Sequence, residues 1–221
     1  MYSTRESKKE RIANFLGLNK KFHKLGVDFI DEGIYDVVSP VEAKLIGFGE
    51  IKENGIISTS EDEICLEKVI GKKARLFSNG FYLKFYLHPK NKHYWVVPYD
   101  GKFISTKIND NKAKIPIIIG EYFKRFNYLF EKAIEKNATI GSVLETKYFP
   151  IFMLAIGSYN VNAIHMNYKE DKNYKKGEVC GYFSIGSGML LGFPDHELEL
   201  LIEKGDEVKI GMPIVRINCK D

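Results

Sequence analysis

The residues best suited to do chemistry in this sequence lie in one glycine-rich stretch, residues 176–193. Within it, Ser187 stands between two glycines in an otherwise apolar run. A serine hydrolase elbow is excluded, because it needs glycines where Ile185 and Met189 stand. The glycine spacing does not fit a dinucleotide-binding fingerprint, and a phosphate-binding loop would need a Gly-Lys-Ser/Thr sequence. What remains is a Gly-Ser pair in an apolar strand.

The same stretch resembles the self-cleavage site of the phosphatidylserine decarboxylase family. The family sequence G-Y-F-x-I/F-G-S, followed by apolar residues, is matched from Gly181 to Ser187. Other pieces resemble family motifs in the family's order: V-S-P-x-D-G at residues 38–43, L-L-G at 66–71, F-x-x-G at 77–80, L-S-P-x-D-Y-H-R-x-H-x-P at 86–98, E-T-x-x-G-P at 144–150 and V-G-A-x-x-V-G-S-I at 156–164. The resemblance covers residues 35–217.

The resemblance implies an enzyme that makes a pyruvoyl cofactor from its own backbone. The hydroxyl of Ser187 would attack the carbonyl of Gly186, and β-elimination would leave residue 187 as an N-terminal pyruvoyl group on a new chain of 35 residues. Serine is needed because its oxygen is both the nucleophile and the leaving group. The pyruvoyl group would then accept electrons as a serine phospholipid loses carbon dioxide. The implied function is phosphatidylserine decarboxylation to the ethanolamine lipid.

By the same resemblance, catalysis falls to Ser187, His93 and Glu42. The family uses an Asp-His-Ser triad for self-cleavage. Its aspartate position is Glu42, whose additional methylene moves the carboxylate by about 1 Å. Its histidine position is Val96, which cannot accept a proton. His93 keeps the other histidine of the motif, which the family associates with decarboxylation, and it is the candidate proton donor; an ordinary hydrogen-bonded histidine is the alternative.

Two histidines are candidates to replace the missing base. His88 stands in place of the usual serine of L-S-P, and His165 follows the strand region near residue 156. The charged N-E-R cluster of the family is also replaced, by Asn137-Ala138-Thr139. No metal-ligand spacing accompanies these residues, so we expect no metal.

Apolar spacing along the sequence predicts the elements that position these residues. Together they indicate an α+β, sheet-dominated single domain with barrel-sandwich-like C-terminal strands, an N-terminal amphipathic helix and one long internal helix. The predicted elements are strands in 37–51, a hairpin-rich sheet in 80–104, a helix over 117–136 opened by Pro116, strands over 151–158 and 178–193, a charged loop over 169–176, and short strands with a turn over 200–217. Lipoyl and biotinyl carriers use such a turn, but a separate hairpin with a lysine at its tip is missing.

The N-terminal segment, residues 1–34, is predicted to be a basic amphipathic helical region. It precedes a decarboxylase-like domain over residues 35–221. Self-cleavage would divide the whole sequence into chains 1–186 and 187–221. Residues 1–25 contain seven basic and two acidic residues, a net charge of +5, and apolar residues recur every three or four positions from Phe15. Such a helix fits an anionic membrane or the surface of its own domain. Nucleic acid is not expected, because no other basic face is evident.

The composition describes a globular chain of 221 residues that is 44% hydrophobic. It excludes a collagen-like, disordered or disulfide-dense protein. No apolar run reaches the roughly 18–20 residues of a membrane-spanning helix, and no secretory signal is recognised. We expect a cytoplasmic protein, peripheral on the membrane. Cys65, Cys180 and Cys219 form no spaced pair and are expected to be unreactive.

Three functions stay open at this point. The first is a pyruvoyl-dependent phospholipid decarboxylase with an altered base, whose partners would be the phospholipid substrate, an anionic membrane surface contacted by residues 5–25, and a second copy in a homodimer. The second is a divergent homologue that binds phospholipid without self-cleavage, as the loss at Val96 indicates. The third is a decarboxylase of a soluble amino acid.

Overall fold

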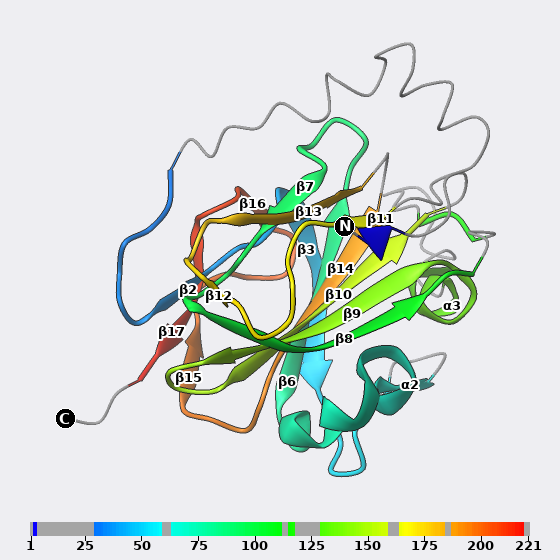
Figure 1. Cartoon of the computed structure of the whole chain (residues 1–221), viewed down its shortest axis with the longest axis horizontal. Helices are drawn as coiled ribbons and strands as arrows, with labels where there is room; N and C mark the ends of the chain where they lie inside the picture. The colour runs from blue at the N-terminus through cyan, green and yellow to red at the C-terminus, as the bar shows by residue number, and fades with distance from the viewer. Residues whose placement is uncertain are drawn as a thin grey trace.

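Within the described residues, an antiparallel sheet of eight strands forms the centre of the molecule (Figure 1). The computed structural model describes residues 2–3, 29–58, 63–111, 115–117, 129–158, 164–183 and 187–218. The strands of this central sheet follow the order β12 (Asn173–Tyr174), β8 (Gly101–Asn109), β9 (Thr139–Thr146), β10 (Pro150–Gly157), β14 (Ser187–Phe193), β6 (Phe81–Leu87), β3 (Ala43–Glu50) and β16 (Glu207–Val208).

Two smaller sheets contribute to an apolar core on one face of the central sheet. In the described part of the chain, the covering sheet has the order β1 (Tyr2–Ser3), β11 (Ile164–Met166), β13 (Val179–Phe183) and β7 (Tyr94–Val96). The other sheet has the order β15 (Leu198–Leu200), β17 (Pro213–Ile217) and β2 (Asp36–Val38). Buried residues of both sheets join those of the central sheet in this core.

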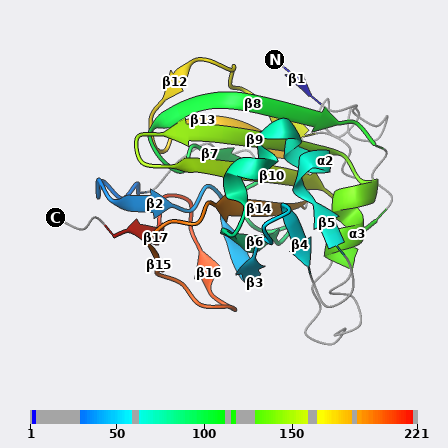
Figure 2. The ribbon, with the colours of Figure 1, turned by 90° about the horizontal axis from the view of Figure 1, so that it is seen from below.

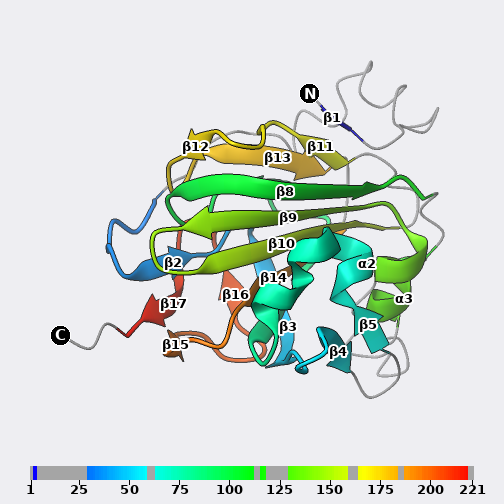
Figure 3. The ribbon, with the colours of Figure 1, turned by 60° about the horizontal axis from the view of Figure 1, so that its bottom comes forward.

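Short helices cover the opposite face. They are α2 (Leu66–Ile70), the 3-10 helix η2 (Gly71–Phe77) and α3 (Leu129–Lys136), with a hairpin of β4 (Ile56–Ser58) and β5 (Glu63–Cys65) beside them. Figures 2 and 3 show α2 and α3 against the central sheet, on the side away from β13. Their buried residues form a second apolar core with the central sheet.

Strand β6 illustrates why the central sheet is apolar on both faces. Leu83, Phe85 and Leu87 point into the first core, whereas Tyr82 belongs to the second. This follows from the period of two along a strand. Each fully buried Leu or Phe side chain contributes roughly 1.5–3 kcal/mol relative to exposure, so the alternation ties β6 to both layers.

The strand predicted over residues 178–193 is wrong as a single strand. It is two strands, β13 in the covering sheet and β14 in the central sheet. A run of apolar residues cannot reveal this change of sheet, because both halves are buried. Ser187 is therefore the first residue of β14, and residues 184–186, which connect it to β13, lie outside the described residues.

The predicted hairpin-rich sheet in 80–104 is also corrected. β6 and β8 belong to the central sheet but are not neighbours, and β7 between them belongs to the covering sheet. The connection 88–93, which contains Pro89, leads from one sheet to the other. The predicted strand over 151–158 is confirmed as β10, and the predicted charged loop 169–176 contains the short strand β12, whose Tyr174 is buried.

The described residues contain no long helix. Of the helix predicted over 117–136, α3 supplies Leu129–Lys136, and Ile117 is not helical. Residues 118–128 lie outside the described residues, as do residues 4–28 of the predicted N-terminal helix. The domain boundary at residue 34 stays a prediction. No helix in the described ranges is long and apolar enough to cross a membrane.

The two cysteines in the described ranges, Cys65 and Cys180, are free thiols. Burial raises the pKa of the Cys180 thiol well above its ordinary value. A buried thiol of this kind is a poor nucleophile, as expected from the sequence. Cys219 lies outside the described residues.

Candidate active site

One end of the central sheet brings together chain segments that are far apart in the sequence. Ser187 on β14 pairs with Gly157 on β10 and with Leu87 on β6. The register of β3 on β6 continues this row to Ala43, which pairs with Val208 on β16. Ser187 and Ala43 are two strand spacings apart, roughly 10 Å. The segments that continue beyond this row carry most of the candidate residues.

Ser187 is wholly buried at the first position of β14. Its side chain shares a face with Met189 and Leu191, which point into the core between the central and covering sheets. Its Oγ atom has no hydrogen-bond partner among the described residues. A buried hydroxyl without a partner costs about 1–3 kcal/mol. The structure therefore holds the Ser187 hydroxyl buried and unpaired at some cost in stability.

On the opposite face of β14, Gly188 lies against the side chains of Phe130 and Ile117. A Cβ atom at residue 188 would lie 2.6 Å from Cε2 of Phe130 and 3.3 Å from Cδ1 of Ile117. Only a glycine lets α3 approach β14 this closely. The Phe130 ring thus fixes the backbone directly after Ser187.

Asn137 anchors the end of β10, the strand that pairs with Ser187. Its side-chain amide donates hydrogen bonds to the carbonyl oxygens of Gly157 and Ile115, both at 2.7 Å. Gly157 is the residue that pairs with Ser187. The sequence comparison marked this position only as the loss of a charged cluster and gave no indication of its positioning role.

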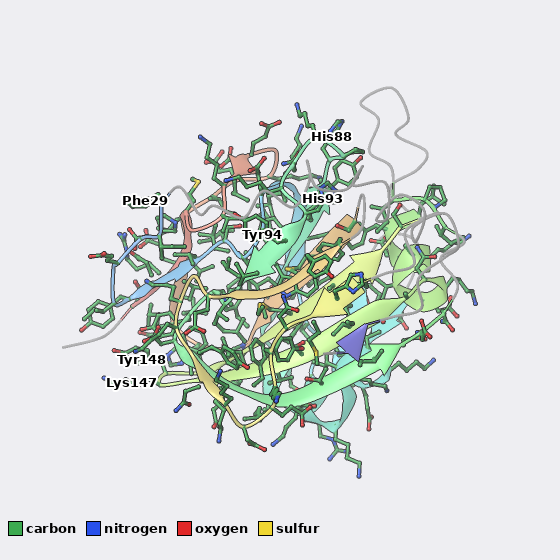
Figure 4. All side chains as sticks on the ribbon, turned by 45° about the horizontal axis from the view of Figure 1, so that its top comes forward. Phe29, His88, His93, Tyr94, Lys147 and Tyr148 are labelled. Carbon is green, nitrogen blue, oxygen red and sulfur yellow. The ribbon has the colours of Figure 1, made fainter. Side chains whose placement is uncertain are left out.

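His93 lies next to the end of β13. It is wholly buried, and its backbone carbonyl accepts a hydrogen bond from the amide of Phe183 at 2.6 Å. Phe183 is the last residue of β13, three residues before Gly186. Figure 4 shows His93 and His88 at one end of the molecule, with Lys147 and Tyr148 at the other.

The hydrogen bond of the His93 ring defines its tautomer. Nδ1 lies 2.6 Å from the carbonyl oxygen of Asn91. A carbonyl oxygen can only accept, so Nδ1 carries the proton and Nε2 is the basic nitrogen of the neutral ring. Such a histidine is able to take a proton at Nε2 and return it.

A cavity of about 720 Å³ opens beside this end of the sheet. Glu42 lines it together with Lys90, Asn91 and Lys92 of the connection 88–93, and with residues 207–210, 212 and 213. Glu42 directly precedes Ala43 in the row described above. The cavity therefore shares its wall with the segment that holds His93.

The sequence model of phosphatidylserine decarboxylase matches residues 21–216, which is most of the chain. The chain belongs to the phosphatidylserine decarboxylase family. Three relatives are called phosphatidylserine decarboxylase proenzyme. The chain is 29% identical over 186 residues to that of Halalkalibacterium halodurans, 27% over 187 residues to that of Fusobacterium nucleatum and 27% over 172 residues to that of Geobacillus kaustophilus. These matches cover 82%, 80% and 77% of this chain, but 69%, 59% and 62% of the relatives.

This member of the decarboxylase family has an apolar residue where the family's self-cleavage histidine is expected. Val96 is wholly buried and clusters with Tyr94 and Ile210. Its amide donates to the carbonyl oxygen of Pro40 at 2.9 Å, and Ile210 also lines the cavity with Glu42. The structure thus brings positions 42 and 96 into one neighbourhood, but no base stands at residue 96.

The two replacement candidates are placed differently. His165 is buried on β11 with its ring stacked on Tyr182, at a centroid distance of 4.2 Å. Its neighbours Ile164 and Met166 point into the core that Ser187 faces, so His165 faces away from Ser187. His88 directly follows Leu87, the neighbour of Ser187, but it is exposed and its Nδ1 accepts a hydrogen bond from the amide of Lys90 at 3.2 Å. Of the histidines considered, His93 is the one that is wholly buried and contacts the end of β13, four residues before Ser187 in the sequence.

Proposed function

We propose that this chain is a pyruvoyl-dependent decarboxylase of a serine phospholipid, activated by self-cleavage between Gly186 and Ser187. The observation that carries the proposal is the Ser187 hydroxyl, which is wholly buried at the start of β14 and has no hydrogen-bond partner among the described residues. Membership of the decarboxylase family supports the same reaction.

The cleavage uses atoms that the chain itself supplies. Oγ of Ser187 attacks the carbonyl carbon of Gly186, and the amide nitrogen of residue 187 becomes a free amine while an ester forms. Elimination then breaks the Cβ–O bond, leaving Gly186 as a carboxylate, and water releases ammonia from residue 187. The pyruvoyl group formed in this way supplies an electron sink for decarboxylation.

The surroundings of residue 187 fit such a group. β14 is hydrogen-bonded on both sides, to β10 and to β6, from Ser187 onward. Residue 187 would therefore keep its position after the chain is cut. The apolar side chains around it exclude water and strengthen electrostatic interactions within the site.

In this proposal His93 moves the protons. Its Nδ1–H group is oriented by the carbonyl oxygen of Asn91, and Nε2 would take the proton from Ser187 during cleavage and donate a proton after carbon dioxide leaves. A positioned acid or base of this kind typically contributes 10²–10⁴-fold to a rate. Membrane contact through residues 5–25, which lie outside the described residues, and a homodimer complete the proposal.

A second candidate is a homologue that binds phospholipid without cutting itself. The buried apolar cluster of Val96, Tyr94 and Ile210 favours it, because this cluster takes the place of the family's base. A decarboxylase of a soluble amino acid is the third candidate, and no feature of the described residues specifically favours it.

The experiment is the release of carbon dioxide from carboxyl-labelled phosphatidylserine in detergent micelles by the purified chain. We expect release by the parent and none by Ser187→Ala, which lacks the precursor of the cofactor. Release from free serine at a similar rate would favour the third candidate. No release from either substrate, together with an uncut chain, would favour the second.

A further inference from the structure

A cavity of about 310 Å³ lies on the helix side of the central sheet. Figure 3 shows the elements that line it gathered on this side. We call it the helix-side cavity, and its lining consists of residues 63–65 of β5, Lys68 and Val69 of α2, Asn109 at the end of β8, and Glu131, Ile134 and Glu135 of α3. None of these residues belongs to the candidate active site.

The lining of the helix-side cavity is negatively charged. Three glutamates and one lysine line it, a formal charge of −2. Glu63 and Glu135 are exposed and pair with Lys52 and Lys136, two lysines that do not line the cavity. Exposed ion pairs of this kind are weak. A ligand that carries an ammonium group can therefore take the place of either lysine.

The third carboxylate, that of Glu131, is buried, with 5% of the residue exposed. Its Oε1 atom pairs with Lys84 of β6, whereas Oε2 has no hydrogen-bond partner among the described residues. An ionised carboxylate accepts hydrogen bonds at both oxygens, and burying it without enough donors is costly. Glu131 therefore brings an unused acceptor to the wall of the cavity.

The rest of the lining fits the alkyl part of a ligand. Ile64, Val69 and Ile134 are buried residues of the second apolar core, and the side-chain amide of Asn109 offers a further acceptor. The lining does not suit a metal ion, because no group of three or more His, Cys, Asp or Glu residues in the described ranges is placed to hold one. An organic ammonium group needs only hydrogen-bond acceptors and an apolar surface beside them.

We propose that the helix-side cavity binds a small aliphatic amine in its protonated form, with the ammonium group at Glu131 and Glu135 and the alkyl chain against the apolar wall. The two glutamates are four residues apart on α3 and so share one side of the helix. The volume is at the lower end of the range for ligand pockets, which suits a small ligand. This site lies on the opposite face of the central sheet from the Ser187 side chain and does not depend on the proposed function.

Cys65 provides a reporter inside the helix-side cavity, because it is a partly buried free thiol in the lining. The test measures the rate at which iodoacetamide modifies Cys65 in the folded full chain at neutral pH, by mass spectrometry of the digested protein. Butylamine is the probe. Butanol, sodium chloride at the same ionic strength and magnesium chloride are the comparisons. Modification of Cys180, which is wholly buried, reports any loss of the fold.

Two exposed glutamates give a matched pair of variants. Glu135→Lys places an ammonium group in the lining, whereas Glu203→Lys makes the same change outside it. We expect butylamine to slow the modification of Cys65 by about threefold or more in the parent and in Glu203→Lys, because an occupied cavity excludes the reagent. In Glu135→Lys the effect is lost. Glu131→Gln, which removes the buried charge, loses it as well while Cys180 stays unmodified.

A rate of Cys65 modification that butylamine does not change would overturn the proposal. So would equal slowing by butanol, which would show an apolar cavity without ammonium recognition, or equal slowing by magnesium, which would show a divalent cation site. Equal slowing in Glu135→Lys and Glu203→Lys would overturn it too. None of these results depends on whether the chain cuts itself, so the proposed function is tested separately.

Discussion

At the scale of single residues, the candidate site consists of a buried serine hydroxyl, a buried histidine and an apolar residue at position 96. Ser187 is buried without a hydrogen-bond partner in the described part of the chain, and His93 is buried beside the end of β13 with its tautomer defined by Asn91. Val96 lies in an apolar cluster near Glu42. Because a base speeds proton transfer only if it can accept a proton, we expect a basic residue at position 96 to speed the proposed self-cleavage beyond what His93 alone supports.

Restoring the family's acid and base should accelerate cleavage. We expect Glu42→Asp/Val96→His to raise the rate of cleavage by about 10²-fold or more, measured as the fraction of cut chain over time. The buried histidine should cost about 1–3 kcal/mol of stability. Glu42→Asp/Val96→Asn is the control, because asparagine is polar but not basic. An equal rise in the control would contradict this account of residue 96.

Replacing His93 should separate its role from that of the fold. We expect His93→Asn to lower the rate of carbon dioxide release by about 10²-fold or more, measured on chain that has already been cut. His196→Asn is the matched control, since His196 is exposed just beyond β14 at its far end from Ser187. Turnover that is equally reduced in both variants would show that His93 is not the proton carrier.

At the scale of elements, α3 contacts β14 next to Ser187 through Phe130, and an ion pair connects α3 to the central sheet. Lys84 of β6 forms an ion pair with Glu131 of α3, and its ammonium lies 5.2 Å from the centre of the Phe130 ring. Both side chains are largely buried, at 15% and 4% exposure. The pair therefore fixes where Phe130 meets Gly188.

A methyl group at residue 188 should clash with this helix. We expect Gly188→Ala to slow self-cleavage by about 10²-fold, because a displacement of about 1 Å at a reacting group has that effect. Adding Phe130→Leu should restore most of the rate by removing the atoms in conflict. Phe77→Leu, a buried phenylalanine of the same core that does not adjoin Gly188, should not restore it. Rescue by both substitutions would contradict a specific role for Phe130.

Breaking the ion pair should be more costly than removing it. We expect Lys84→Met to lower the free energy of unfolding by about 3–5 kcal/mol, because Glu131 would remain as a buried unpaired charge. The double variant Lys84→Met/Glu131→Leu should recover most of this loss. Urea unfolding of the three proteins measures it, and a double variant as unstable as the single one would show that the pair itself is stabilising.

The spacing of apolar residues predicts whether a segment is a helix or a strand, but it does not predict which sheet a buried strand joins. The buried strand over 151–158 and the helical residues 129–136 were predictable, because apolar spacing reports local conformation. The division of 178–193 between two sheets was not, since both halves are equally apolar. Ser187, His93 and Glu42 were found through family motifs, whereas Lys84, Phe130 and Asn137 act through contacts across the fold that no motif records.

At the scale of the whole molecule, β14 begins at the proposed cleavage position and is an internal strand of the central sheet. β14 lies between β10 and β6, and both partners hold it along its length. Cutting before Ser187 leaves these hydrogen bonds and the apolar cores in place. The cleaved protein should therefore remain one folded particle, with residue 187 still at the end of the central sheet.

The two chains should stay together after cleavage. We expect chains 1–186 and 187–221 to elute as one species in native size exclusion and to separate only in denaturant, because β14 is an internal strand. Native mass spectrometry checks this directly. Release of the shorter chain under native conditions would contradict the role assigned to β14.

The central claim is that Ser187 attacks Gly186, and the most direct measurement is the intact mass of the purified chain under denaturing conditions. The account predicts two products, one of residues 1–186 and one of residues 187–221 whose mass shows a pyruvoyl group in place of the N-terminal serine, with Ser187→Ala giving a single uncut chain. A parent that remains one species of 25.4 kDa after prolonged incubation would contradict it.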